Sequence, residues 1–296
     1  MQNMLPFRPP TIGDIPAIQI CTQASLQSDL AAPNLYLLRH KYDTQLLFHM
    51  EHLIRFYPGK GRLCGYTYPI GGNPNNVAAC LNDIKKDAIA RGNKLMFCLL
   101  TETEAQRICD FFDNKVKITC DAGDADYLYN REDLAELPGT LFHKKRNRLA
   151  AFKRHFPHHS FTEMDDKNKF IAMDIAREWY AEQLPSPALL HELHAIEHAL
   201  EHFNVLNLCG GIVRVDGKPV GMCIASQINP GVADIHYEKC LPLYKEAYTY
   251  INNEMALHLT TPLINREEDL NVEGLRAAKI SYHPCLILKK FSALIC

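Results

Sequence analysis

The sequence has 296 residues, of which 47% are hydrophobic and 22% are charged, and its mean hydropathy is -0.19. This composition is typical of a soluble globular protein, and no apolar run approaches the roughly 18 residues that a membrane-spanning helix needs. The formal net charge of -2 gives no overall attraction to nucleic acid, so a polyanion would need a local basic patch. The length allows two domains of about 150 residues each, and we expect two.

The eleven cysteines indicate a reducing environment. They are scattered singly, their number is odd, and no two of them form a CxxC pair, which a zinc ribbon or a thioredoxin-type site would require. Most lie in apolar segments, where a reduced thiol acts as a small hydrophobic side chain. Residues 1–15 also lack the basic region and apolar core of a secretory signal. We therefore expect the protein in the cytoplasm.

The first half of the chain alternates strand and helix patterns. Asp14, just before an Ile-Pro pair, predicts the start of a helix. Thr101 and Glu104 have the spacing of a capping box, which predicts another helix start. After the first helix, we expect three strands, a helix, a strand, a helix and a strand, over residues 45–51, 52–57, 62–69, 75–91, 94–100, 101–113 and 116–120.

A basic segment follows. Residues 137–162 contain no Asp or Glu, and their apolar residues recur on one stripe, which predicts an amphipathic helix over residues 141–155 that links the two halves. One interpretation is a solvated helix face, and the other is a binding surface for the phosphates of CoA, RNA or lipid. The cations of this segment are Lys144, Lys145, Arg146, Arg148, Lys153 and Arg154.

A helix predicted over residues 188–203 is rich in histidine. His194, Glu197 and His198 match the HxxEH pattern of inverted zinc peptidases. Two histidines four residues apart can place two nitrogens on one metal ion. However, the chain contains 14 histidines, and no separate third ligand can be identified in the sequence. We therefore predict an amphipathic helix and no metal.

The second half repeats the element order of the first. The Asp-Gly pair at 216–217 predicts a hairpin. In the strand that follows the hairpin, alternation places Asp234, His236 and Glu238 on one face and the intervening residues on the other. We expect three strands, a helix, a strand, a helix and a strand, over residues 206–215, 218–227, 232–240, 244–259, 262–265, 272–280 and 285–288.

The repeated order predicts two similar mixed α/β units that share one fold. We place the first domain at residues 1–136 and the second at residues 137–296, which includes the basic helix. A cleft between two such units is a natural binding site.

Residues 264–290 combine a charged turn, a short helix and a closing strand. Asn271 can cap the helix, and Arg276 and Lys279 fall three residues apart on one of its faces. Polar residues of both signs between two apolar runs indicate a site held by rigid elements, and the alternative is a salt-bridged loop. The turn itself consists of Asn265, Arg266, Glu267, Glu268 and Asp269.

Four segments share their residues with a known family. They are DADYLYNREDLAELPG, FHKKRNRLAAFKRHFP, ADIHYEKC and INREEDLNVEGLRAAKISYHP. Together they resemble the family related to the C-terminal domain of phosphatidylglycerol lysyltransferase, a tandem GNAT-like acyltransferase fold. The resemblance covers residues 120–290 well and is weaker before them, where the element order and a TYPIGG stretch carry it.

The resemblance implies a binding site for the CoA pyrophosphate at a helix N-terminus, where backbone N–H groups face an anion. Glu246 departs from the family pattern, because relatives tend to have glycine there and an acid repels phosphate. The glycine turn at residues 71–74 is an alternative anion site. The predicted cofactor-binding residues are Lys245, Glu246, Ala247 and Tyr248 in this loop, Asn265 beside the pantetheine arm, and Lys144 and Arg146 in the basic helix.

The resemblance also implies residues for acyl transfer, which needs an oriented acceptor, a base and an acid. We predict Glu238 as the base and Tyr282 as the acid, and Asp269 as a third catalytic residue that could hold a cationic group together with Glu268. The predicted substrate-binding residues are His236, Arg266, Glu268 and Arg276.

These residues together predict an acyl- or aminoacyl-transferase. The donor is acyl-CoA or, alternatively, aminoacyl-tRNA, and the acceptor is an amine or hydroxyl of a small-molecule or lipid-like compound. The alternative function is a non-catalytic protein that binds RNA or another polyanion through residues 143–155. Neither function requires a metal.

Overall fold

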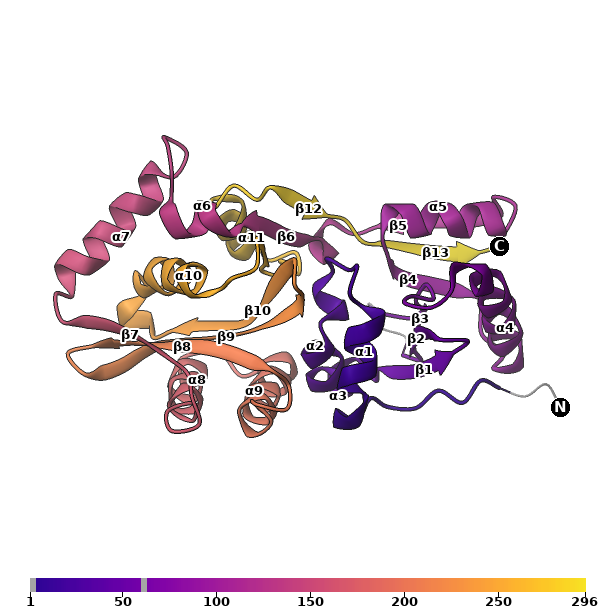
Figure 1. Cartoon of the computed structure of the whole chain (residues 1–296), viewed down its shortest axis with the longest axis horizontal. Coiled ribbons are helices and arrows are strands. Elements are labelled where there is room, and N and C mark those ends of the chain that lie inside the picture. Colours follow the sequence, from indigo (N-terminus) through magenta and orange to yellow (C-terminus); the bar gives the residue numbers. More distant parts are fainter. Residues whose placement is uncertain (1–3, 60–62) are drawn as a thin grey trace.

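The computed structural model describes residues 4–59 and 63–296. It contains two β-sheets that lie side by side, each with helices packed on it (Figure 1). The N-terminal part of the chain forms most of one sheet and the C-terminal part most of the other.

The first sheet has six strands, and its only parallel pair of described strands is β3 with β4. In spatial order its strands are β1 (Gln45–His49), β2 (His52–Tyr57), β3 (Gly65–Tyr66), β4 (Met96–Leu100), β13 (Phe291–Ile295) and β5 (Val116–Cys120). The helices of this half are α1 (Ile15–Cys21), α2 (Ala32–Leu37), α3 (Arg39–Tyr42), α4 (Val77–Ala90) and α5 (Glu102–Phe111), with 3₁₀ turns at Ile12–Asp14, Ser28–Leu30, Pro74–Asn76 and Ala122–Asp124.

The second sheet has seven strands, and within the described residues only β10 and β11 pair in parallel. In spatial order its strands are β12 (Leu286–Leu288), β6 (Asp126–Asn130), β11 (Leu263–Asn265), β10 (Val232–Cys240), β9 (Lys218–Asn229), β8 (Leu208–Val215) and β7 (His159–Glu163). Its helices are α6 (Arg131–Glu136), α7 (His143–His155), α8 (Ile171–Ala181), α9 (Pro187–Glu201), α10 (Ala247–His258) and α11 (Glu273–Ile280), with a 3₁₀ turn at Pro242–Tyr244.

Both halves have the predicted order of elements. β1, β2 and β3 are followed by α4, β4, α5 and β5, and β8, β9 and β10 are followed by α10, β11, α11 and β12. This confirms the predicted fold class, mixed α/β with two tandem units of the expected GNAT-like order. The capping box of α5 is also confirmed, since Thr101 Oγ1 accepts a hydrogen bond from the Glu104 N–H and Glu104 Oε2 accepts one from the Thr101 N–H. The third strand is shorter than predicted, and Arg62 lies outside the described residues.

Two strands cross the predicted domain boundary. β6 precedes residue 137 but pairs with β11 and β12 in the second sheet. β13, which was not predicted, pairs with β4 and β5 in the first. The sheets therefore do not divide the chain into residues 1–136 and 137–296. The physical reason is backbone pairing. β13 lies between β4 and β5, and without it the facing edges of these two strands would have no described strand partner.

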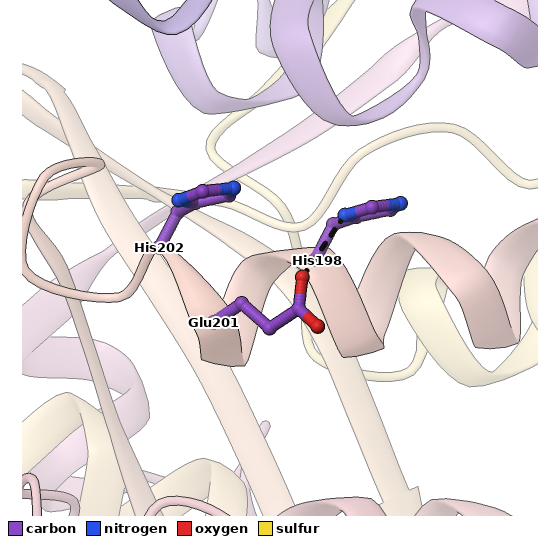
Figure 2. Close-up of side chains that lie close together, drawn as sticks. All are labelled: His198, Glu201 and His202. Atoms are coloured by element: carbon purple, nitrogen blue, oxygen red, sulfur yellow. Dashed lines mark ion pairs between the residues drawn. The ribbon is translucent and has the colours of Figure 1, made fainter.

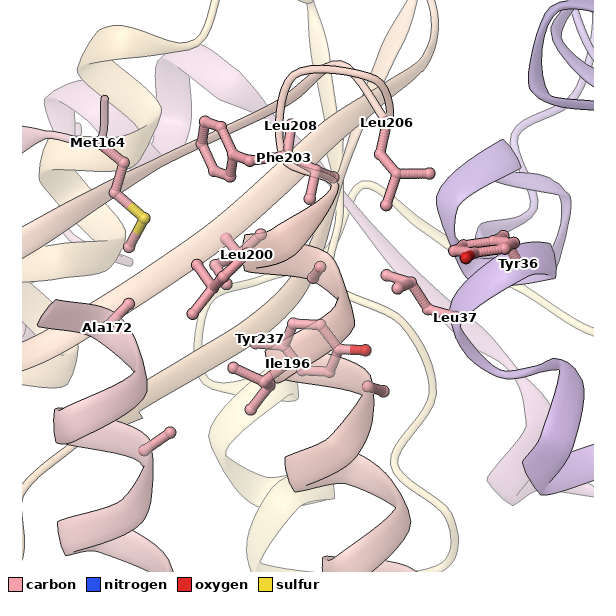
Figure 3. Packing of buried hydrophobic residues seen from close by; sticks show 14 of the residues in the cluster. Tyr36, Leu37, Met164, Ala172, Ile196, Leu200, Phe203, Leu206, Leu208 and Tyr237 are labelled. Carbon is pink, nitrogen blue, oxygen red and sulfur yellow. The ribbon is translucent and has the colours of Figure 1, made fainter. Parts of the chain in front are cut away.

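A hydrophobic core extends across the boundary between the two halves of the protein, which we call the seam. Leu37 points from α2 towards Ile196 and Leu200 on α9, and Tyr36 and Tyr237 belong to the same cluster (Figure 3). Burial of each Ile or Leu side chain contributes about 1.5–3 kcal/mol. The seam is therefore packed like a domain core.

β10 contains a bulge at His236 that changes which side chains share a face. The register with β9 shifts between Ile235 and Tyr237, which leaves His236 as the extra residue. Because one extra residue reverses the alternation, Glu238 joins the face of Ile235, and Asp234 lies on the opposite face. The prediction that Asp234, His236 and Glu238 share one face is therefore wrong.

We expect Ala293→Asp to disrupt the first sheet. Ala293 is fully buried in the middle of β13, so a carboxylate there would be desolvated without a partner. The free energy of unfolding, measured by urea denaturation, should fall by about 3–5 kcal/mol. Ser292→Asp, at a half-buried neighbouring position, should cost much less, and equal losses in the two variants would contradict the placement of β13.

Candidate active site

Two clusters of polar side chains lie close to the seam. We call the first the seam cluster, and it consists of Ser28, Asp29, Asn34, Arg55, Asp126, Asp234, His236, Glu267 and Lys290. We call the second the strand-end cluster, and it consists of Lys145, Glu238, Arg266 and Tyr282. Arg266 and Glu267 are consecutive, so the loop after β11 connects the two clusters.

Lys290 holds one side of the seam cluster together. Its Nζ is 2.7 Å from Asp126 Oδ1 and 2.9 Å from Asp29 Oδ1. Arg55 Nη1 donates a hydrogen bond to Asp29 Oδ2 at 2.7 Å. Burial alone would raise the pKa of Asp29, but the charges of Lys290 and Arg55 outweigh it and lower that pKa. Two cations thus balance two carboxylates on this side of the cluster.

The other side of the seam cluster is acidic. His236 Nδ1 lies 3.3 Å from Asp234 Oδ2 and 3.6 Å from Glu267 Oε1, and Asn34 Nδ2 donates hydrogen bonds to both carboxylates at 3.1 and 2.8 Å. Burial, and then the charge of Glu267, raise the pKa of Asp234 well above its usual range. Asp234 Oδ1 and His236 Nδ1 are buried without a hydrogen bond from any described residue. This arrangement would stabilise a small cation, either an ammonium group or a metal ion.

A pocket of about 50 Å³ opens onto the seam cluster. A space of this size holds a few water molecules or an ammonium group. Acidic and apolar side chains share its wall with the ammonium group of Lys290. The pocket is lined by Ser28, Asp29, Asn34, Leu38, Tyr42, Leu63, Leu99, Glu267, Glu268 and Lys290.

The strand-end cluster brings together three predicted site residues. Arg266 Nη2 donates a hydrogen bond to Glu238 Oε1 at 3.0 Å, and the Arg266 guanidinium lies 5.1 Å from the ring centroid of Tyr282. Glu238 Oε2 is buried and receives no hydrogen bond from the described part of the chain. Burial raises the pKa of Tyr282, although the charge of Arg266 opposes the increase. The phenol is thus held protonated, and one carboxylate oxygen remains able to accept a proton.

Lys145 belongs to this cluster, although the sequence analysis selected its neighbours Lys144 and Arg146. Its Nζ lies 3.4 Å from the ring centroid of Tyr282 and donates a hydrogen bond to Ser281 Oγ at 2.7 Å. Burial, and then the charges of nearby arginines, lower its pKa to about 8. Its burial could have been predicted from helical spacing, because position 145 falls on the same apolar stripe as residues 142, 149 and 152.

β10 and β11 separate next to these clusters. Residues 232–234 of β10 pair with residues 263–265 of β11, but β10 continues to Cys240. Beyond Asp234, no described strand pairs with this edge of β10. A sheet edge without a strand partner is a place where an extended substrate can bind, here beside Glu238.

Other predicted residues bind one another or the backbone. Arg276 Nε lies 2.7 Å from Asp269 Oδ2, which also accepts a hydrogen bond from the Tyr127 hydroxyl. Asn265 Nδ2 donates to Asp126 Oδ2 at 3.1 Å, and Glu268 lines the pocket. Catalysis by Asp269 and substrate binding by Arg276 and Glu268 stay predictions.

The loop predicted to bind CoA carries an acid at the start of α10. Glu246 Oε2 lies 3.1 Å from His155 Nδ1 on α7. Lys245 and Lys144 are exposed, whereas Arg146 Nη1 donates to the carbonyl oxygens of residues 137 and 139. Glu246 thus places a negative charge next to the helix N-terminus at which a phosphate would bind, although its carboxylate makes no capping hydrogen bond to α10.

Six of the nine residues of the seam cluster were not predicted from the sequence. Asp29, Asn34 and Arg55 lie before residue 120, where the family resemblance is weak, and Lys290 follows the last predicted strand. The one available signal was Asp126, which lies within the first of the four quoted segments.

A model of a known protein family matches most of the chain, including both clusters. The family model described as "Phosphatidylglycerol lysyltransferase, C-terminal" matches residues 23–294. The chain belongs to this family. Both clusters lie within the matched range. None of the helices in residues 4–59 and 63–296 is long and apolar enough to cross a membrane.

Individual relatives agree with the membership in this family. A conserved protein of unknown function from Bacteroides thetaiotaomicron is 31% identical, with a TM-score of 0.92 over 99% of this chain and 100% of that one. L-PGS from Bacillus licheniformis shares the fold at 12% identity, with a TM-score of 0.66 over 97% of this chain and 92% of that one. A curated relative, an uncharacterised protein of Mycoplasmoides gallisepticum, is 22% identical over 178 residues, or 56% of this chain. The match spans about half of that relative, 54% of its length.

We expect Lys290→Met to destabilise the protein strongly. Loss of the ammonium group leaves the carboxylates of Asp29 and Asp126 without their shared cation in a buried site. Urea denaturation should show a loss of about 3–5 kcal/mol in the free energy of unfolding. Lys289→Met is the matched control, because Lys289 is exposed. The ion network would have no structural role if both variants were equally stable.

Proposed function

We propose that the protein is an aminoacyltransferase that moves the aminoacyl group of an aminoacyl-tRNA to an amine or hydroxyl acceptor. The acidic side of the seam cluster is the observation that carries this proposal. Within the described residues, the carboxylates of Asp234 and Glu267 have Asn34 and His236 as their hydrogen-bonding and ion-pair partners. Every aminoacyl ester carries an α-ammonium group, and a lysyl ester carries a second one. Such a group would oppose the increase in the pKa of Asp234 and pair with its ionised carboxylate.

The loop before α10 favours aminoacyl-tRNA over acyl-CoA as the donor. The positive end of a helix dipole attracts phosphate. Here the Glu246 carboxylate already lies at that end and pairs with His155, so a CoA pyrophosphate would meet a like charge. An ester at the 3′ end of tRNA does not need this phosphate site.

α7 supplies a surface for the tRNA backbone. Four of its cations, Lys144, Arg148, Lys153 and Arg154, are exposed, and exposed lysine and arginine side chains bind phosphates with a strong salt dependence. The alternative function, a non-catalytic RNA-binding protein, would use the same surface. The two functions differ in whether bound tRNA loses its aminoacyl group.

The strand-end cluster provides the proton transfers for the reaction. The acceptor nitrogen or oxygen attacks the ester carbonyl carbon, and the bond from this carbon to the ribose oxygen breaks. Glu238 accepts the acceptor's proton through Oε2, because Oε1 is held by Arg266. Tyr282 donates a proton to the ribose oxygen, and the cations of Lys145 and Arg266 beside its ring stabilise the phenolate. A proton relayed by water from Glu238 to Tyr282 restores both groups.

The location and the acceptor form part of the same proposal. The cytoplasm supplies charged tRNA and keeps thiols reduced, which agrees with eleven free cysteines. The family description names phosphatidylglycerol, and the glycerol hydroxyls of this lipid belong to the proposed class of acceptor. Small amines belong to it as well.

An assay with radiolabelled lysyl-tRNA tests this function, using phosphatidylglycerol vesicles and small amines as acceptors. Glu238→Gln should lower kcat by about 10²- to 10⁴-fold, because it removes the proton acceptor. Glu182→Gln, at an exposed position beyond α8, should leave the rate unchanged. Transfer from acetyl-CoA but not from lysyl-tRNA would contradict the proposal. Salt-sensitive tRNA binding without any transfer would support the alternative function.

The pKa of Lys145 predicts the basic limb of the pH profile. This pKa is lowered to about 8, so the ammonium form dominates below that pH and is lost above it. We expect kcat to fall as the pH rises through about 8, since the developing phenolate loses its closest cation. Lys145→Arg retains the charge and should move this limb to higher pH, whereas Lys144→Arg should not. An identical limb in all three proteins would rule out this role of Lys145.

A further inference from the structure

The histidine-rich helix α9 contains two overlapping HxxEH patterns. His194, Glu197 and His198 form the first, and His198, Glu201 and His202 form the second, four residues later. The structure does not assemble the first pattern. His194 is exposed, and Glu197 Oε1 lies 3.4 Å from Arg177 Nη2 on α8.

The second pattern forms a compact group of metal-ligand atoms. One ligand atom each from His198, Glu201 and His202 lies within 4.8 Å of the others. The two imidazole rings are parallel, with an interplanar angle of 4° and centroids 6.5 Å apart, and both project from the same face of α9 (Figure 2). Small side-chain rotations would bring the three atoms to the spacing of about 3.4 Å that separates tetrahedral ligands held about 2.0–2.1 Å from zinc.

One nitrogen in this group lacks a hydrogen bond. His198 Nδ1 is buried and lies 3.2 Å from Glu201 Oε2, but the contact does not have hydrogen-bond geometry, and no other described residue bonds to the nitrogen. A buried imidazole nitrogen with a carboxylate oxygen at this distance matches two ligands that share one metal ion.

The group lies at the seam between the halves. The ring of His202 packs edge-on against Tyr36 of α2, with centroids 5.8 Å apart. Figure 2 shows both imidazoles on the side of α9 that faces the helices of the N-terminal half. A cation bound here would fix the end of α9 that packs against α2.

We propose that His198, Glu201 and His202 form a binding site for one zinc-like divalent cation, with a water molecule as the fourth ligand. Imidazole and carboxylate ligands suit Zn²⁺, Co²⁺ and Ni²⁺. The site shares no residue with the seam cluster or the strand-end cluster, and it does not depend on the proposed aminoacyl transfer. It stabilises the contact between α9 and α2.

Calorimetric titration of the full-length, chelator-treated protein with Zn²⁺ tests the proposal. We expect one equivalent to bind, and binding should raise the melting temperature because the metal favours the folded state. His202→Ala and Glu201→Ala should each weaken binding about tenfold or more and abolish the rise in melting temperature. His194→Ala should change neither, since His194 is exposed on the same helix outside the ligand group.

Co²⁺ provides a second measurement that does not depend on stability. The visible absorption of bound Co²⁺ should show nitrogen and oxygen ligands in tetrahedral geometry and should disappear in His202→Ala. Circular dichroism checks that each variant is folded. Absence of stoichiometric binding, equal binding in the His202→Ala variant, or a thiolate absorption band that assigns the metal to cysteine would overturn the proposal.

Discussion

The buried ion network of Lys290 controls how the two halves of the protein are joined. Lys290 is the residue before β13, and Asp126 is the first residue of β6, so one ion pair anchors both strands that cross between the sheets. Asp29 adds a third segment, from the N-terminal half. Burial opposes the charge of Lys290, but Asp126 and then Asp29 outweigh it and raise its pKa well above the usual range. Burial also raises the pKa of Asp126, and the charge of Lys290 opposes that increase. Removal of the Lys290 ammonium group would therefore leave buried carboxyl groups without their shared cation.

The chemistry of the site follows from this junction. The bulge at His236 turns Asp234 and Glu238 to opposite faces of β10, so one strand serves both clusters. Asp234 lies on the side where the N-terminal half supplies Asn34, and Glu238 lies with Arg266 of the loop after β11. One side thus attracts a cation while the other holds a proton acceptor beside a protonated phenol. The proposed reaction of an aminoacyl ester uses both functions.

Local patterns predicted the element order and the capping box of α5. The family resemblance selected Glu238, Arg266 and Tyr282 as site residues, and the structure brings them together. Local patterns failed where distant segments meet. An alternating pattern cannot show a bulge, so the faces of β10 were predicted wrongly. Asp29, Asn34 and Lys290 are ordinary polar residues until folding brings them together, and a five-residue apolar run at the C-terminus contains nothing that assigns it to the first sheet. Lys145 was within reach, because its position on the apolar stripe of α7 marks it as buried.

In the proposed function, the acidic side of the seam cluster binds the ammonium group of the aminoacyl donor. A crystal structure with a non-hydrolysable lysyl-adenosine analogue would locate that group. We expect an ammonium nitrogen within hydrogen-bonding distance of Asp234 or Glu267, with the acyl carbonyl between Glu238 and Tyr282. An analogue bound elsewhere, or one whose ammonium groups remain in solvent, would contradict it.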